Sequence, residues 1–361
     1  MRSWLACMAV LAGCASAPKA STLPRVEPPS AEDARAAFRD ALGQLRAGRC
    51  EEAVASFDAV AERFADSRYV SASLYNAGLC LQRLEQWGAS ATRYERILEV
   101  RPGSPDTKHT RFQLAFLYLE TQRFSEALEV SEMLEAHTGL TSDERSEIMA
   151  RRAEALLGLE RLDESAAAAD EALHFYRSRT GDARVRDPFF AASAAYTLAE
   201  TFRLRSEAVV IPEADVESQR EVLESRAALL LRAQRGYFDA MAFGDPYWSS
   251  ASGYRIGALY DGFWDAITQA PVPPPRQPLE GEALALHRRA YRARLAELAR
   301  PLVRHAIRYW ELTLAMVERT GVHSEWTDRI REDLARARKR MAEIAPTAKH
   351  QGDSGRRKQP G

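Results

Sequence analysis

The chain has 361 residues, of which 46% are hydrophobic and 28% are charged, and 50 Lys and Arg against 51 Asp and Glu leave a formal net charge of −1. This composition is typical of a folded protein with a sizeable core, and the charge balance argues against nucleic-acid binding, which needs a strongly basic face. The sequence contains no run of about 18 apolar residues, so it predicts no membrane-spanning helix.

The first 13 residues have the pattern of an export signal. Arg2 precedes a short apolar run, and small residues lead to Cys14. The motif Leu11-Ala12-Gly13-Cys14 resembles the lipobox of bacterial lipoproteins, in which the signal is removed and the cysteine is acylated. The resemblance implies a lipid anchor at Cys14. Ala15 follows the cysteine, which by the same resemblance implies the outer membrane, with the protein facing the periplasm.

Two other interpretations of this segment stay open. Ala15-Ser16-Ala17 also fits the cleavage site of an ordinary signal peptidase, which would release a soluble periplasmic protein. Alternatively, Cys14 is an unmodified cysteine in an apolar leader. The next segment, residues 14–30, is rich in proline and lacks apolar periodicity, so we interpret it as an extended tether.

Helical periodicity dominates from residue 31, and it repeats every 37 to 38 residues over residues 31–178. Four columns of equivalent residues recur: Ala41, Gly78, Ala115 and Ala153; Cys50, Trp87, Phe124 and Leu162; Ala53, Ser90, Ala127 and Ser165; Val60, Ile97, Leu134 and Ala172. Small residues let two paired helices approach each other, and the bulky column fills the turn between them. The pattern resembles the tetratricopeptide repeat (TPR), whose unit is about 34 residues. The resemblance implies an all-α, TPR-like α-solenoid.

The apolar periodicity beyond residue 178 also predicts helices. Residues 179–270 are interpreted as degenerate helical repeats, and residues 271–345 as C-terminal helices that follow a proline-rich loop and cap the solenoid. The periodicity predicts these helices over residues 189–205, 213–241, 246–270, 279–320 and 325–344. Residues 346–361 are polar and basic, which predicts a disordered tail.

The inner face of the stacked first helices is the predicted partner-binding surface. The aromatic residues Phe38, Tyr75 and Phe112 recur 37 positions apart, one in each repeat. Neighbouring positions add Arg83, His109 and Phe116. Aromatic rings flanked by cations could hold an extended or helical peptide through apolar contact and charge pairing. The alternative is that the rings pack between adjacent repeats.

Cys50 and Cys80 are the thiols that remain after removal of the signal and acylation of Cys14. Two such thiols often pair in an oxidising compartment. In a TPR both would lie toward the same end of the stack, and a bond would close a loop of about 30 residues. The alternative is two buried free thiols that act as small hydrophobic residues.

The sequence offers no catalytic constellation. Its seven histidines lack the spacing of a metal site, and no glycine-rich phosphate loop follows a strand. We therefore expect no enzyme, metal or cofactor, but a scaffold that binds other cell-envelope proteins in outer-membrane assembly, envelope coordination, or trans-envelope motility or secretion. The alternative is an envelope enzyme or glycan-binding protein that uses the repeats as a platform, which an acidic pair in a C-terminal cleft would favour.

Overall fold

The computed structural model describes residues 30–344 of the chain. The predicted signal, the predicted acylation of Cys14, nearly all of the predicted tether and the predicted tail at residues 346–361 lie outside the described residues. Helices are the only regular secondary structure within residues 30–344. The prediction of an all-α, TPR-like α-solenoid with a C-terminal helical extension is confirmed.

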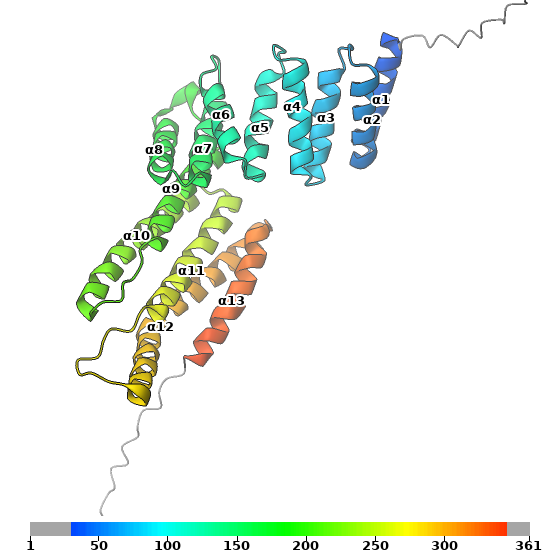
Figure 1. The fold of residues 1–361 in the computed structure, drawn as a ribbon. Helices are drawn as coiled ribbons and strands as arrows, with labels where there is room; N and C mark the ends of the chain where they lie inside the picture. The colour runs from blue at the N-terminus through cyan, green and yellow to red at the C-terminus, as the bar shows by residue number, and fades with distance from the viewer. Residues whose placement is uncertain (1–29, 345–361) are drawn as a thin grey trace, which may run out of the picture.

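The described chain forms antiparallel helix pairs followed by two further helices (Figure 1). The first helices of the pairs are α1 (Ala31–Arg46), α3 (Val70–Arg83), α5 (Thr107–Glu120), α7 (Ser142–Gly158), α9 (Phe189–Glu207) and α11 (Pro246–Gln269). The second helices are α2 (Cys50–Arg63), α4 (Trp87–Val100), α6 (Phe124–Glu135), α8 (Leu162–Ser178) and α10 (Val216–Ala242), while α11 pairs with the first of the two C-terminal helices. The C-terminal helices are α12 (Gly281–Thr320) and α13 (Glu325–Glu343), and a 3₁₀ turn, η1 (Gly181–Ala183), precedes α9.

The repeated small residues lie where the two helices of each pair touch. Ala41, Ala115 and Ala153 are fully buried. The serines of the second helices add a hydrogen bond across the pair: the Ser90 hydroxyl donates to the Gly78 carbonyl at 2.9 Å, and the Ser165 hydroxyl donates to the Ala153 carbonyl at 2.8 Å. The sequence columns therefore mark close helix contacts, two of which are reinforced by the same side-chain to backbone bond.

Each of the first four turns contains one residue with a left-handed backbone. These residues are Gly48, Glu85, Gln122 and Glu160, with φ angles of 75°, 56°, 58° and 58°. Each lies two residues before a second helix begins. Because left-handed φ is unfavourable for most residues, the turns impose a local cost that the packing of the helix pair offsets. Only the first turn uses glycine, so sequence composition gave no signal for the other three.

Substitution of Gly78 tests whether the small column is a packing requirement. A Cβ at this position would lie 2.7 Å from Cζ of Tyr94, a fully buried ring. We expect Gly78→Ala to lower the free energy of unfolding by about 1–3 kcal/mol, because the added methyl overpacks the core. Gly43 in α1 has open space around it, so Gly43→Ala should be neutral or stabilising by up to about 1 kcal/mol. Urea unfolding followed by circular dichroism compares the two; equal effects would contradict the packing requirement.

The stack changes direction near α9, so that α11, α12 and α13 lie below the row formed by α1–α6 (Figure 1). α5 packs against α7, α7 against α9, and α9 against α11. α13 packs on α11, where the Tyr247 hydroxyl donates to Oε1 of Glu325 at 3.2 Å. The first helices therefore form one continuous face along the inside of the bend, which we call the inner face.

Candidate functional site

The six residues predicted to bind a partner divide into three groups in the structure. Phe38 packs between repeats, with its ring centroid 5.8 Å from that of Phe57 and 5.1 Å from that of Tyr69. Phe112 is only 8% exposed and lies in the main core. These two rings therefore adopt the packing role that the sequence had left as the alternative. Arg83 is exposed at the end of α3.

Tyr75 and His109 line a cavity of about 420 Å³ between the first helices α3 and α5. Tyr75 is half-buried, and its ring centroid lies 5.3 Å from that of Tyr94. His109 is exposed. Burial is the main reason why the pKa of the Tyr75 hydroxyl is raised. Ser71, Asn76 and Asp106 complete the polar part of the lining. We call this the outer-repeat cavity.

Phe116 lines a second cavity of about 370 Å³ at the inside of the bend, which we call the bend cavity. Helices α5, α7, α9 and α11 all contribute to it. Its lining is aromatic and acidic: Phe116, Leu119, Glu120, Arg151, Glu154, Phe189, Phe190, Ser193, Tyr247 and Trp248. Only Phe116 among these residues belongs to the partner-binding set predicted from the sequence. No sequence signal could have grouped them, because they come from four helices spread over about 130 positions of the chain.

The charges of the bend cavity are unevenly balanced. The Arg151 guanidinium lies 5.3 Å from the ring centroid of Phe116 and 5.4 Å from that of Phe190. It pairs with Glu147 at 2.8 Å, so its own charge is compensated. By contrast, the side-chain carboxylates of Glu120 and Glu154 form no hydrogen bond or ion pair with any other residue of the described segment.

Burial is the main cause that raises the pKa of Glu154, to about 7; the Glu120 carboxylate adds to the rise and Arg151 opposes it. Burial also raises the pKa of Glu120. The negative charge of Glu325 at the start of α13 adds to this rise, and the positive charge of Arg151 opposes it. A carboxyl that titrates near neutral pH beside a second carboxylate is unusual away from functional sites. The cavity therefore carries carboxylate charge that Arg151 offsets only in part.

A buried ionic cluster supports the bend next to this cavity. Glu200 of α9 is 4% exposed and accepts hydrogen bonds from Nη2 of Arg203 at 2.7 Å and from the Tyr237 hydroxyl of α10. Nε of Arg255 in α11 lies 3.0 Å from Oε1 of Glu200 and also donates to the Tyr196 hydroxyl at 3.0 Å. The Glu200 carboxylate thus connects three consecutive helices. Tyr196, which belongs to this cluster, packs against Trp248 on the cavity wall, with 5.1 Å between the two ring centroids.

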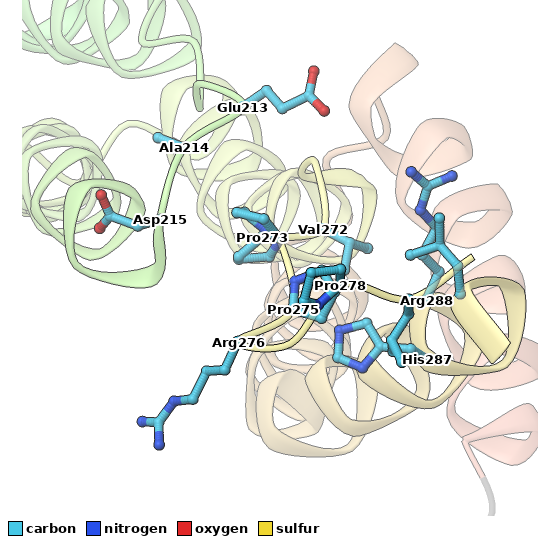
Figure 2. A pocket seen from close by; sticks show the side chains of 13 residues that line it. Glu213, Ala214, Asp215, Val272, Pro273, Pro275, Arg276, Pro278, His287 and Arg288 are labelled. Carbon is cyan, nitrogen blue, oxygen red and sulfur yellow. The ribbon is translucent and has the colours of Figure 1, made fainter.

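A further cavity, about 540 Å³, lies by the proline-rich loop between α11 and α12 (Figure 2). Figure 2 shows the rings of Pro273, Pro275 and Pro278 gathered at its centre near His287. The charged ends of Glu213 and Arg276 point away from that centre. Asp215 caps the start of α10, where it accepts from the backbone of Ser218 at 3.0 Å. Because its charged groups do not converge, we do not identify this cavity as a site.

Cys50 and Cys80 are both buried in the same apolar cluster, where the structure gives them as free thiols. Burial first, and the adjacent Cys50 second, raise the pKa of the Cys80 thiol to about 12. The structure thus places the two side chains together, and their pairing stays a prediction.

A Cys50–Cys80 bond in protein exported to an oxidising compartment is the hypothesis to test against the alternative of two buried free thiols. Alkylation of the unfolded protein should then label neither thiol before reduction and both after it. Reduction should lower the free energy of unfolding by about 3 kcal/mol, because the bond restricts the unfolded chain. Two labelled thiols before reduction would favour the alternative of buried free thiols.

Within residues 30–344, no group of three or more histidine, cysteine, aspartate or glutamate side chains is placed to hold a metal ion. No helix in the same segment is both long and apolar enough to cross a membrane.

No protein-family model and no curated protein sequence matches the chain. Several solved structures resemble it, among them the following three. A tetratricopeptide repeat protein from Parabacteroides merdae is 13% identical, with 85% of this chain and 99% of that chain covered and a TM-score of 0.42. MamA from Desulfovibrio magneticus RS-1 is 19% identical over 54% of this chain and 94% of that chain, with a TM-score of 0.37. The Pseudomonas aeruginosa pilF protein is 18% identical over 64% and 94%, with a TM-score of 0.36. At these values, the fold assignment rests on the helix arrangement described above.

Proposed function

We propose that the protein is a lipid-anchored scaffold that binds other cell-envelope proteins along the inner face of its solenoid. One observation carries the proposal: the inner face holds two cavities, and three of the six predicted partner-binding residues, Tyr75, His109 and Phe116, line them. An extended face with separate cavities suits a partner segment that places successive side chains into them.

Binding can be tested in cells by crosslinking and mass spectrometry. Ser71 and His109 lie on the wall of the outer-repeat cavity, so Ser71→Arg with His109→Glu should remove the crosslinked partners of the unaltered protein. Glu129 of α6 and Asp170 of α8 are exposed on second helices, and Glu129→Arg with Asp170→Arg should leave the partners unchanged. If the inner-face variant keeps every partner, the proposed binding face is wrong.

The anchor belongs to the same proposal and rests on the resemblance of Leu11-Ala12-Gly13-Cys14 to a lipobox. Acyl chains contribute about 0.8 kcal/mol for each buried methylene, so several chains hold a protein on a membrane stably. We expect labelled palmitate to enter the unaltered protein and not Cys14→Ser, which should also leave the outer-membrane fraction. Equal labelling of both proteins would refute the anchor.

A second candidate function is favoured by one observation in the bend cavity. Two carboxylates, one with a pKa near 7, beside aromatic rings also occur in proteins that bind or cleave glycans. The test is release of reducing sugar from purified peptidoglycan by the protein and by Glu154→Gln. We favour the scaffold because a neutral sugar would leave both carboxylates without a counter-charge.

A further inference from the structure

Three properties of the bend cavity together define the ligand that fits it. Its volume of about 370 Å³ has room for one long side chain and part of the adjoining peptide, not for a folded surface. Five aromatic residues line its walls, and the faces of such rings attract cations through their charge distribution. Its two carboxylates, Glu120 and Glu154, form no hydrogen bond or ion pair with another described residue, so a bound cation would gain the attraction of both.

Arg151 shows how these walls accommodate a guanidinium. It is held between Phe116 and Phe190 while Glu147 neutralises its charge. The rest of the cavity is also lined by aromatic rings and carboxylates. Among its described lining residues, Arg151 is the only cation.

Trp248 contributes a hydrogen-bond donor, its indole N–H. Its side chain lines the cavity and the residue is only 9% exposed, yet its indole Nε1 has no hydrogen-bond partner in the described part of the chain. A buried N–H without an acceptor costs about 1–3 kcal/mol. An acceptor on a bound segment, such as a peptide carbonyl, would remove that cost once a small shift of the side chain opens Nε1 to the cavity.

We propose that the bend cavity binds one lysine or arginine side chain of a partner protein, between Glu120, Glu154 and the aromatic walls, while Trp248 Nε1 donates to a carbonyl of the same segment. This inference rests on the proposed scaffold function and names the partner chemistry: a segment with a basic residue at the point where the partner crosses the bend. The other candidate occupants are a glycan and this chain's own Arg356, Arg357 and Lys358.

The test uses the full chain and three short peptides: acetyl-Gly-Arg-Gly-amide, its lysine equivalent, and its citrulline equivalent, which has the shape of arginine without the charge. In calorimetric or NMR titrations we expect the basic peptides to bind about tenfold more tightly than the citrulline peptide. Glu120→Gln and Glu154→Gln should each weaken binding of the basic peptides about tenfold, whereas Glu129→Gln on α6 should not change it. Trp248→Phe keeps an aromatic wall and should weaken all three peptides severalfold.

The dependence on pH gives an independent readout. The groups around Glu154 are Arg151 on its own helix, Glu120 of α5, with Glu325 of α13 beyond it, and Tyr247 of α11. A bound cation lowers the pKa of Glu154 from its free value of about 7. Affinity for the basic peptides should therefore be complete above neutral pH and fall as the pH drops below about 7. Glu154→Gln should remove this dependence.

Several results would overturn the proposal. Equal affinity for the arginine and citrulline peptides would exclude charge recognition, and tighter binding of an N-acetylglucosamine oligomer would identify a glycan site. If Arg356→Gln, Arg357→Gln and Lys358→Gln together strengthen peptide binding, the chain's own tail occupies the cavity. The scaffold function has a separate test: if Glu120→Gln and Glu154→Gln keep all crosslinked partners while the Ser71 and His109 variant loses them, the scaffold stands and the cation site fails.

Discussion

Glu200→Ala should lower the free energy of unfolding by about 3–5 kcal/mol, because it leaves the charges of Arg203 and Arg255 partly buried without their shared partner. The side chains of these two arginines are 14% and 25% exposed, and Glu200 contacts both. The Tyr237 hydroxyl, which donates to Glu200, would also lose its acceptor. Urea unfolding followed by circular dichroism measures the loss.

The matched control lies on the same arginine. Glu207 pairs with Nη1 of Arg203 at 2.6 Å, but its side chain is 53% exposed. A pair this open to water contributes about 1 kcal/mol or less, so Glu207→Ala should have a small effect. If Glu200→Ala costs no more than Glu207→Ala, the buried cluster does not hold the bend together.

Trp310→Ala should be similarly costly, about 3–5 kcal/mol, because it empties the largest fully buried side chain of the C-terminal helices. The ring packs with Ile330 and Leu334 of α13, and its Nε1 donates to the Tyr254 carbonyl of α11 at 3.0 Å. We expect unfolding of the C-terminal helices to become easier, which amide hydrogen exchange in α11–α13 detects together with urea unfolding.

Two further variants separate packing from general effects on α12. Leu312 lies two positions away and is 55% exposed, so Leu312→Ala should change stability by less than about 0.5 kcal/mol. A Cβ at Gly257 would lie 2.3 Å from Nε1 of Trp310. Gly257→Ala should therefore destabilise the unaltered protein but cost much less once Trp310 is alanine. Additive costs of Gly257→Ala and Trp310→Ala would show that the two residues do not pack as described.

Most of the fold follows from sequence periodicity. The repeat spacing of 37 to 38 residues locates the helix pairs, because each set of equivalent buried residues forms the same contact in every pair. The predicted helix over residues 246–270 corresponds to α11 (Pro246–Gln269), and the predicted helix over residues 325–344 to α13 (Glu325–Glu343). The start of α10 differs by three residues because Asp215, not an earlier residue, caps it. Local signals of this kind are strong in sequence.

The site was less predictable, for a physical reason. The recurrence of Phe38, Tyr75 and Phe112 identifies equivalent positions, but it cannot tell whether a ring faces the neighbouring repeat or the inner face. Phe112 lies in the core, whereas Tyr75 reaches a cavity wall. The bend cavity depends on where α9 and α11 fall relative to α5, and this relation is set by the buried contacts of Glu200, which periodicity does not encode.

Site-specific photocrosslinking in cells tests most directly whether the inner face binds the partner. A photoreactive residue would replace His109 or Glu120 on the inner face, and Glu129 or Asp170 on the second helices, all four of which are exposed. The scaffold proposal predicts the same partner adduct from His109 and Glu120 and none from Glu129 and Asp170. Adducts from the second helices with none from the inner face would contradict it.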